Sequence, residues 1–181
     1  MSKAVMLSIR PKWCEKIASG EKTIEVRKTK PKLETPFKCY IYCTLPKYPH
    51  EDFIATDYPR PQFYGGGKVV GEFTCDRIYE IRKRGILENF DYCYLSLNEW
   101  GNDDIETEIR AISASCVLKE ELNAYGAKAP LLYGWHISDL RIYDAPRELS
   151  EFTGLRDTRF GAAPYDIKRT PQSWCYVETL F

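Results

Sequence analysis

The sequence predicts a mainly β protein of the α+β class, built as a small and partly open β-barrel with short peripheral helices. Two observations support this fold class. Five or six segments are rich in the β-branched and aromatic residues that favour strands. The segments that join them are mostly too short to hold crossover helices, which argues against a doubly wound parallel sheet.

The length of 181 residues suits a single domain over 1–181, with loop insertions at about 45–67 and 82–117. The first insertion contains four prolines and a run of three glycines, and the second is acidic in its middle. A hydrophobic content of 44% and an aromatic content of 14% exclude long disordered stretches.

The N-terminal elements follow one another closely. The apolar run 4–10 predicts a strand, because the residue before Pro11 prefers an extended backbone. Pro11 suits the first turn of a short helix, and Gly20 suits the left-handed residue that ends it. Residues 23–29 then alternate as a strand does, with two aliphatic side chains on one face and polar side chains on the other.

The later elements follow from the same patterns. Strands are predicted at 36–44, 68–81, 131–144 and 173–181, and short helices near 103–113, at 119–126 and at 146–152. Gly71 predicts a bulge within its strand, and Gly126 predicts a helix end. Residues 153–170 are predicted to form a loop.

The composition favours a cytoplasmic protein. No run of eighteen apolar residues is present, and the N-terminus lacks the apolar stretch of a signal peptide, so no membrane partner is expected. Seven cysteines without a C-x-x-C motif predict reduced and mostly buried thiols. Cys39 and Cys43 share a strand face, but core packing explains them better than metal binding. We therefore expect no metal and no cofactor.

The charge of the chain is unevenly distributed. Residues 1–40 carry ten Lys and Arg against four Asp and Glu, a net charge of +6. The remainder carries sixteen against twenty-two, a net of −6, and the whole chain is neutral. This asymmetry indicates a basic face for an anionic partner, whereas the pI of about 6.7 argues against non-specific nucleic-acid binding.

The stretch LSIRPKWCEKIASGEKTIEVRK resembles the opening of ASCH domains, a branch of the PUA-like barrels. Their pattern is an apolar strand, a helix that starts with Pro, and then G-x-K-T followed by E-x-R, and these motif residues are here Gly20, Lys22, Thr23, Glu25 and Arg27. VVGEFTCDRI, LYGWHISDLRIYDAPRELSEF and PQSWCYV also resemble the larger bacterial and phage-borne members.

The resemblance implies a cleft beside the G-x-K-T turn and a ligand that is RNA or a modified nucleoside. Some ASCH members hydrolyse N4-acetylcytidine and others are described as ribonucleases, which implies a catalytic role for Lys22 if this chain is an enzyme. In those hydrolases a threonine stands at the position of Glu25, and a further glutamate comes from a later helical region, for which Glu120 or Glu121 is a guess.

The residues themselves suggest how such a ligand would be held. The turn after the first helix places the Lys22 ammonium at the mouth of a groove, and Glu25 with Arg27 can pair or hold one polar ligand between them. The other candidates for the ligand site are Ser8, Arg10, Lys12, Thr23, Trp135 and Trp174. The two tryptophans are candidates for stacking on a base, although core packing explains both as well.

Three functions remain open at this point. The first is a module that binds RNA or a nucleotide-like small molecule in a polar cleft. The second is a hydrolase that acts on RNA or a modified nucleoside and uses Lys22. The third is a protein-interaction module whose acidic segment 88–121 contacts a basic partner. The cluster of charges at 19–28 could also be only a solvated strand face with a weak ion pair.

Overall fold

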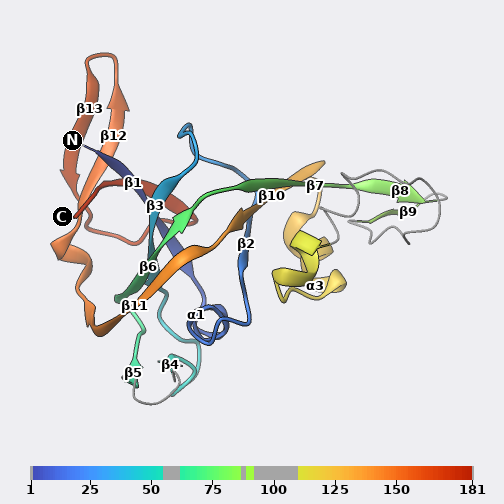
Figure 1. Ribbon diagram of the computed structural model, residues 1–181, viewed down its shortest axis with the longest axis horizontal. Coiled ribbons are helices and arrows are strands. Elements are labelled where there is room, and N and C mark those ends of the chain that lie inside the picture. The colour runs from blue at the N-terminus through green and yellow to red at the C-terminus, as the bar shows by residue number, and fades with distance from the viewer. Residues whose placement is uncertain (1, 55–61, 87–88, 92–109, 181) are drawn as a thin grey trace.

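The computed structural model describes residues 2–54, 62–86, 89–91 and 110–180 (Figure 1). Its main feature is an open seven-stranded sheet in the order β11-β6-β3-β1-β14-β12-β13. These strands are β1 (Lys3–Ile9), β3 (Phe37–Cys43), β6 (Val69–Cys75), β11 (Ser138–Arg147), β12 (Thr153–Thr158), β13 (Gly161–Asp166) and β14 (Trp174–Glu178). Neighbouring strands are antiparallel except β1 and β3, which are parallel.

A smaller three-stranded sheet, in the order β2-β10-β7, lies beside the main one (Figure 1). It is formed by β2 (Ile24–Arg27), β10 (Leu131–His136) and β7 (Ile78–Arg82). Two short hairpins, β4 (Phe53–Ile54) with β5 (Phe63–Tyr64) and β8 (Arg84–Ile86) with β9 (Asn89–Asp91), complete the strands. The helices are α1 (Pro11–Ala18), α3 (Lys119–Gly126), the 3-10 turn η1 (Leu149–Glu151) and a helical segment at 110–114. The sheets do not close, so the predicted mainly β, partly open architecture is confirmed.

The N-terminal predictions are correct in order and nearly in boundary. The strand ends at Ile9, Pro11 is the first residue of α1, and Gly20 has the positive φ of 78° that the helix end requires. Because α1 and β2 form the connection between the parallel strands β1 and β3, this short segment holds β2 and its charges close to the end of β1.

Three groups of buried side chains hold the sheets together. Alternate residues of β1 pack on opposite faces, so that Val5 and Leu7 meet α1 while Ala4 and Met6 meet the C-terminal half of the chain. The third group joins the small sheet to α3 and the 110–114 helix, with Leu122 at its centre. Each face of β1 is therefore covered, which explains why its sequence is a continuous apolar run.

Two predicted strands are each divided in the structure. The segment 68–81 forms β6 and β7, and the segment 131–144 forms β10 and the beginning of β11. Both breaks lie at the passage from the large sheet to the small one, where the His136 N–H donates to the Arg77 carbonyl. The chain passes between the two sheets twice at this level, once from β6 to β7 and once from β10 to β11. Asp139, near the start of β11, has a positive φ at the second passage. A bulge does occur beside Gly71, as predicted.

The C-terminal predictions are partly wrong. Residues 153–170, predicted as a loop, contain the hairpin of β12 and β13. The predicted helix at 146–152 is a 3-10 turn after a strand that continues to Arg147. The helix α3 includes Gly126, and the residue of positive φ that follows it is Ala127. The 45–67 insertion contains the β4–β5 hairpin, of which Ile54 is fully buried.

Some predictions fall on residues outside the described ranges. They include most of the predicted helix near 103–113, much of the acidic segment 88–121, and Cys93. In the described ranges, no helix combines the length and the apolar character needed to cross a membrane. Those ranges also contain no group of three or more His, Cys, Asp or Glu side chains that could hold a metal ion. The six described cysteines are free thiols.

Candidate functional site

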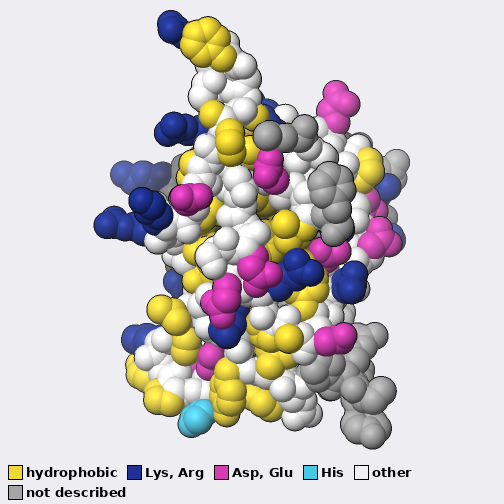
Figure 2. Space-filling view, turned by 90° about the vertical axis from the view of Figure 1, so that its left-hand side faces the viewer, with side chains coloured by type: hydrophobic (Ala, Val, Ile, Leu, Met, Phe, Trp, Pro, Cys, Tyr) yellow, Lys and Arg dark blue, Asp and Glu magenta, His cyan; other side chains and the backbone are white. Residues whose placement is uncertain are grey.

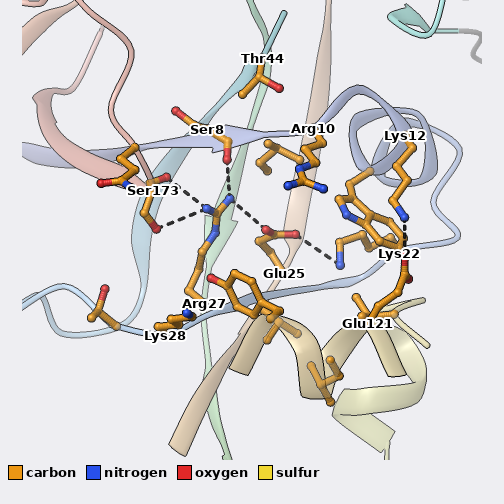
Figure 3. Close-up of a pocket in the computed structure, with 18 of the residues that line it drawn as sticks. Ser8, Arg10, Lys12, Lys22, Glu25, Arg27, Lys28, Thr44, Glu121 and Ser173 are labelled. Carbon is orange, nitrogen blue, oxygen red and sulfur yellow. Dashed lines mark hydrogen bonds and ion pairs between the residues drawn. The ribbon is translucent and has the colours of Figure 1, made fainter. Parts of the chain in front are cut away.

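A cleft of about 940 Å³ opens where the end of β1, the start of α1, β2, α3 and the segment 170–173 come together (Figure 3). Its polar lining residues are Ser8, Arg10, Lys12, Lys22, Glu25, Arg27, Lys28, Thr29, Thr44, Glu121, Tyr125, Thr170, Gln172 and Ser173. Five of these are cations and two are carboxylates, which leaves three net positive charges around the cleft. The cleft thus lies in the basic N-terminal part of the chain, beside the predicted turn.

Arg27 connects three segments of the chain at one wall of the cleft. Its Nη2 atom lies 2.9 Å from Glu25 Oε1 and donates to the Ser8 carbonyl at 2.8 Å. Its Nη1 atom donates to the Ser173 carbonyl at 3.2 Å and to the Ser173 hydroxyl at 3.4 Å. The side chain is buried, so these contacts fix the guanidinium between β1, β2 and the segment before β14 (Figure 3).

Lys22 is only 1% exposed and lies at the inner end of the same group of charges. Its Nζ atom donates to the carbonyls of Ile24 and Ser115 at 2.7 and 2.6 Å, and Glu25 Oε2 lies 3.3 Å away. Three acceptors therefore surround an ammonium that has three N–H donors. The prediction that Lys22 projects into the mouth of the groove is wrong, because the turn folds the side chain inward under the helix that precedes it.

Glu25 joins the two cations, with one carboxylate oxygen turned to each (Figure 3). The expected position of Glu25 and Arg27 on one strand face is confirmed by this pairing. The alternative of a solvated strand face is wrong, since all three side chains are less than a tenth exposed. Burial of charge is unfavourable unless each ion is paired and hydrogen-bonded, and here the contacts supply both conditions.

One donor of this buried group has no partner in the described part of the chain. Arg27 Nε is inaccessible to solvent and makes no hydrogen bond there. The group therefore carries one net positive charge and one unused N–H at the wall of a cleft. The indole Nε1 of Trp135, in the core, is likewise buried and without a partner in the described part of the chain, so both donors are exceptions to the rule that buried polar atoms are nearly always satisfied.

The outer rim of the cleft adds cations and aromatic rings. Lys12 pairs with Glu121 at 2.6 Å and lies 4.1 Å from the Trp13 ring centroid, so it closes the gap between α1 and α3. The hydrogen bond from Lys12 lowers the pKa of Glu121. Lys28 lies over the ring of Tyr125 at 5.1 Å. The rim thus carries two cation–ring contacts, Lys12 with Trp13 and Lys28 with Tyr125.

Arg10 differs from the other rim cations. Its side chain lines the cleft and is exposed, and it makes no ion pair or hydrogen bond with the residues that the structure describes. In Figure 3 its guanidinium lies above Glu25 and points into the opening. Arg10 is therefore available to an incoming anion without first breaking an ion pair or hydrogen bond to the described residues, and its electrostatic influence there falls on the Glu121 carboxylate.

Three of the nine predicted site residues do not line the cleft. Thr23 uses its backbone to bond Ala114 and Ile137. Trp135 is 0% exposed and packs edge-on against Phe37 in the core, so a base cannot stack on it. Trp174 donates from its indole to Thr29 Oγ1 at 3.0 Å and supports the cleft from behind. The structure does bring Ser8, Arg10, Lys12, Lys22, Glu25 and Arg27 together.

Several cleft residues could not be recognised in the sequence. Ser173 and Gln172 come from the C-terminal segment, and Tyr125 comes from α3. None of them was predicted as a site residue, although Gln172 and Ser173 lie in the PQSWCYV stretch; they reach the cleft because β14 pairs with β1 and α3 packs on the small sheet. Glu121, one of two glutamates considered as a partner of Lys22, does line the cleft.

Comparison with known proteins identifies the fold. No family model and no curated protein matches the chain. Solved structures that match include an ASCH protein from Zymomonas mobilis, with a TM-score of 0.56 and 16% identity over 97% of this chain and 87% of that one. Two mutants of that protein match with TM-scores of 0.53 and 0.51 at 14% and 15% identity. They cover 98% and 97% of this chain and 91% and 88% of theirs.

Proposed function

We propose that the cleft binds an anionic, nucleotide-like ligand, and that the natural ligand is RNA. The chain has the ASCH fold, whose cleft was expected beside the G-x-K-T turn. The observation that supports binding most directly is the surplus of positive charge around a cleft of ligand size, with Arg10 exposed at its rim and free of ion pairs to the described residues. A phosphate would neutralise this surplus.

The lining residues divide into two groups under this proposal. Arg10 and Lys28, both exposed, contact the phosphate, and the ring of Tyr125 offers a surface on which a base can stack. The hydroxyls of Ser173 and Thr29 and the amide of Gln172 supply hydrogen-bonding groups for sugar and base. The buried Lys22, Glu25 and Arg27 hold the wall in position.

The geometry favours binding over hydrolysis. A hydrolase needs a group that can accept or donate a proton near the substrate. The Lys22 ammonium is enclosed by three acceptors, so it has no free position from which to act as a nucleophile. The lowered pKa of Glu121 makes this carboxylate a weak base. One of its oxygens is also already paired with Lys12, so Glu121 is poorly suited to accept a proton from a substrate.

The test uses exposed cleft residues, so that binding is separated from stability. Arg10→Gln should weaken the binding of nucleoside 5′-monophosphates about 10-fold or more, because a charge-assisted hydrogen bond contributes about 1.5–3 kcal/mol. Lys28→Gln should weaken it less, since its ammonium already contacts Tyr125. Lys47→Gln, an exposed change in the 45–67 segment, is the control. Calorimetric titration that gives equal affinities for all four proteins would overturn the proposal.

A second measurement separates binding from catalysis. Incubation with N4-acetylcytidine should release no acetate, and incubation with single-stranded RNA should leave it uncut. Repeated turnover of either substrate by the intact protein, lost in Arg10→Gln, would assign the cleft to a hydrolase instead.

A further inference from the structure

The hairpin of β12 and β13 extends well beyond the sheet to which it belongs. Its two strands pair with each other over their whole length, but β12 pairs with β14 only at Gly154 and Leu155. Residues 156–164, which we name the arm, therefore project from the body, as Figures 1 and 2 show. All of its residues except Ala163 are exposed, so the arm makes no core that would explain its presence.

The tip of the arm has a fixed shape. Thr158 pairs with Gly161, which leaves Arg159 and Phe160 as the two central residues of the turn. The Thr158 hydroxyl donates to the Gly161 carbonyl at 2.7 Å and accepts from the Phe160 N–H at 3.2 Å. Gly161 has a φ of 109°, which an L side chain would strain. The turn thus holds two side chains outward at the farthest point of the arm.

The chemistry of the tip combines an aromatic ring with a cation. Phe160 is 85% exposed, and the Arg159 guanidinium carbon lies 4.5 Å from the centroid of its ring. An aromatic ring can stack on a nucleobase, while a guanidinium beside it can contact the adjoining phosphate. Figure 2 shows this hydrophobic and basic pair at the end of the arm.

The charge of the arm and of the segment that follows it is positive. Arg156, Arg159, Lys168 and Arg169 have no carboxylate partner in the described part of the chain. Residues 156–169 also hold two acidic residues, of which Asp157 is paired with Lys3 and Asp166 is exposed, so this stretch keeps a net charge of +2. A surface that offers unpaired cations and one aromatic ring, with little other apolar area, complements a nucleic-acid strand better than it does an apolar protein surface.

The arm is also continuous with the cleft. Lys168 and Arg169 follow β13 after the buried Ile167, and the next four residues, 170–173, form one wall of the cleft. A single nucleotide in the cleft is too small to contact a hairpin that projects about 14 Å past the sheet. A longer strand that leaves the cleft along 168–170 could contact both.

We propose that the arm is a second contact site for single-stranded RNA, with Phe160 stacked on a base and Arg159 and Arg156 bound to phosphates. The inference rests on the proposed function of the cleft and deepens it, because it assigns the part of the RNA strand outside the cleft to the arm. The cleft holds one nucleotide and the arm binds the strand outside it.

The test compares two exposed pairs of the same chemistry, one on the β12–β13 hairpin and one in the segment between β3 and β4; Figure 1 shows the β12–β13 and β4–β5 hairpins far apart. Arg159→Gln/Phe160→Ala removes the pair on the arm. Lys47→Gln/Tyr48→Ala removes an exposed cation–ring pair beside Glu51, with 5.2 Å between ammonium and ring centroid. Each protein is titrated into a labelled 12-residue single-stranded RNA, followed by fluorescence anisotropy, and separately into a nucleoside 5′-monophosphate. Melting temperatures confirm that both variants remain folded.

The arm variant should bind the 12-residue RNA at least about 5-fold more weakly, the loss expected for one stacked base, and with a smaller salt dependence. Its affinity for the monophosphate should be unchanged, and the control variant should match the unmodified protein. Equal RNA affinity of both variants would overturn the inference and leave the cleft proposal intact. RNA binding without monophosphate binding would overturn the cleft proposal alone, and no binding of either ligand would overturn both. A dimer in sedimentation that the arm variant abolishes, with RNA binding unchanged, would assign the arm to self-association.

Discussion

Replacement of Lys22 by methionine should lower the free energy of unfolding by about 3–5 kcal/mol. Methionine keeps the aliphatic part of the side chain but removes the ammonium, which leaves the carbonyls of Ile24 and Ser115 without a donor. Each buried carbonyl left unsatisfied costs about 1–3 kcal/mol. Glu25 keeps its contact with Arg27, so the carboxylate is not left entirely alone. The sum of these effects agrees with the cost of breaking a buried ion pair.

Urea denaturation followed by tryptophan fluorescence measures this loss. With a denaturant dependence of about 2 kcal/mol per M, the midpoint should fall by about 2 M. The control is Lys16→Met, which removes an exposed pair with Glu21 and should leave the midpoint where it is. Equal midpoints for Lys22→Met and the control would refute the reasoning, because the Lys22 contacts would then contribute no more than a solvated ion pair does.

Two further predictions concern the main sheet. Burial alone would raise the pKa of Glu72, but hydrogen bonds from Lys38 and Tyr143 lower it below its usual 4.5. A carboxyl group with a lowered pKa stabilises the fold above its unfolded pKa and loses this contribution as the pH falls through the folded value. The free energy of unfolding, measured below about pH 4.5, should therefore decline less steeply with falling pH in Glu72→Gln than in the unmodified protein. Gly71→Ala would place its Cβ 2.6 Å from the Arg141 carbonyl oxygen. We expect the free energy of unfolding, measured in the same urea assay, to fall by about 1–3 kcal/mol. An unchanged midpoint would show that β11 can move away from the new methyl group.

The sequence predicts the fold best where the signals are local. Pro11, Gly20 and the apolar run before them define a strand, a helix and its end without help from distant residues. The sequence does not predict the β12–β13 hairpin, because Gly161 and Pro164 are unfavourable in strands. In the arm, each of the two strands is held by its pairing with the other. The division of the two long strands depends on how the sheets meet, which no local pattern specifies.

The site shows the same division between local and distant contributions. Alternation along β2 correctly places Glu25 and Arg27 on one face. The burial of these charges depends on Ser115 and Ser173, whose positions in the chain are remote from the turn. A dense cluster of charges normally indicates a solvated surface, and only tertiary contacts reverse that expectation here.

The buried position of Glu25 has a consequence for the relation of this chain to the ASCH hydrolases. The resemblance implies a threonine at this position in those enzymes, and a hydroxyl carries no charge to pair with a lysine. In this chain the carboxylate occupies both Lys22 and Arg27, so the two cations stabilise the wall of the cleft and do not face a substrate. If the cleft binds an anion as proposed, the contacts come from the rim, where Arg10 makes no ion pair with the described residues, and from cations outside the cleft such as those of the arm. Under the proposed function, Glu25 is therefore the residue on β2 that commits Lys22 and Arg27 to the wall of the cleft.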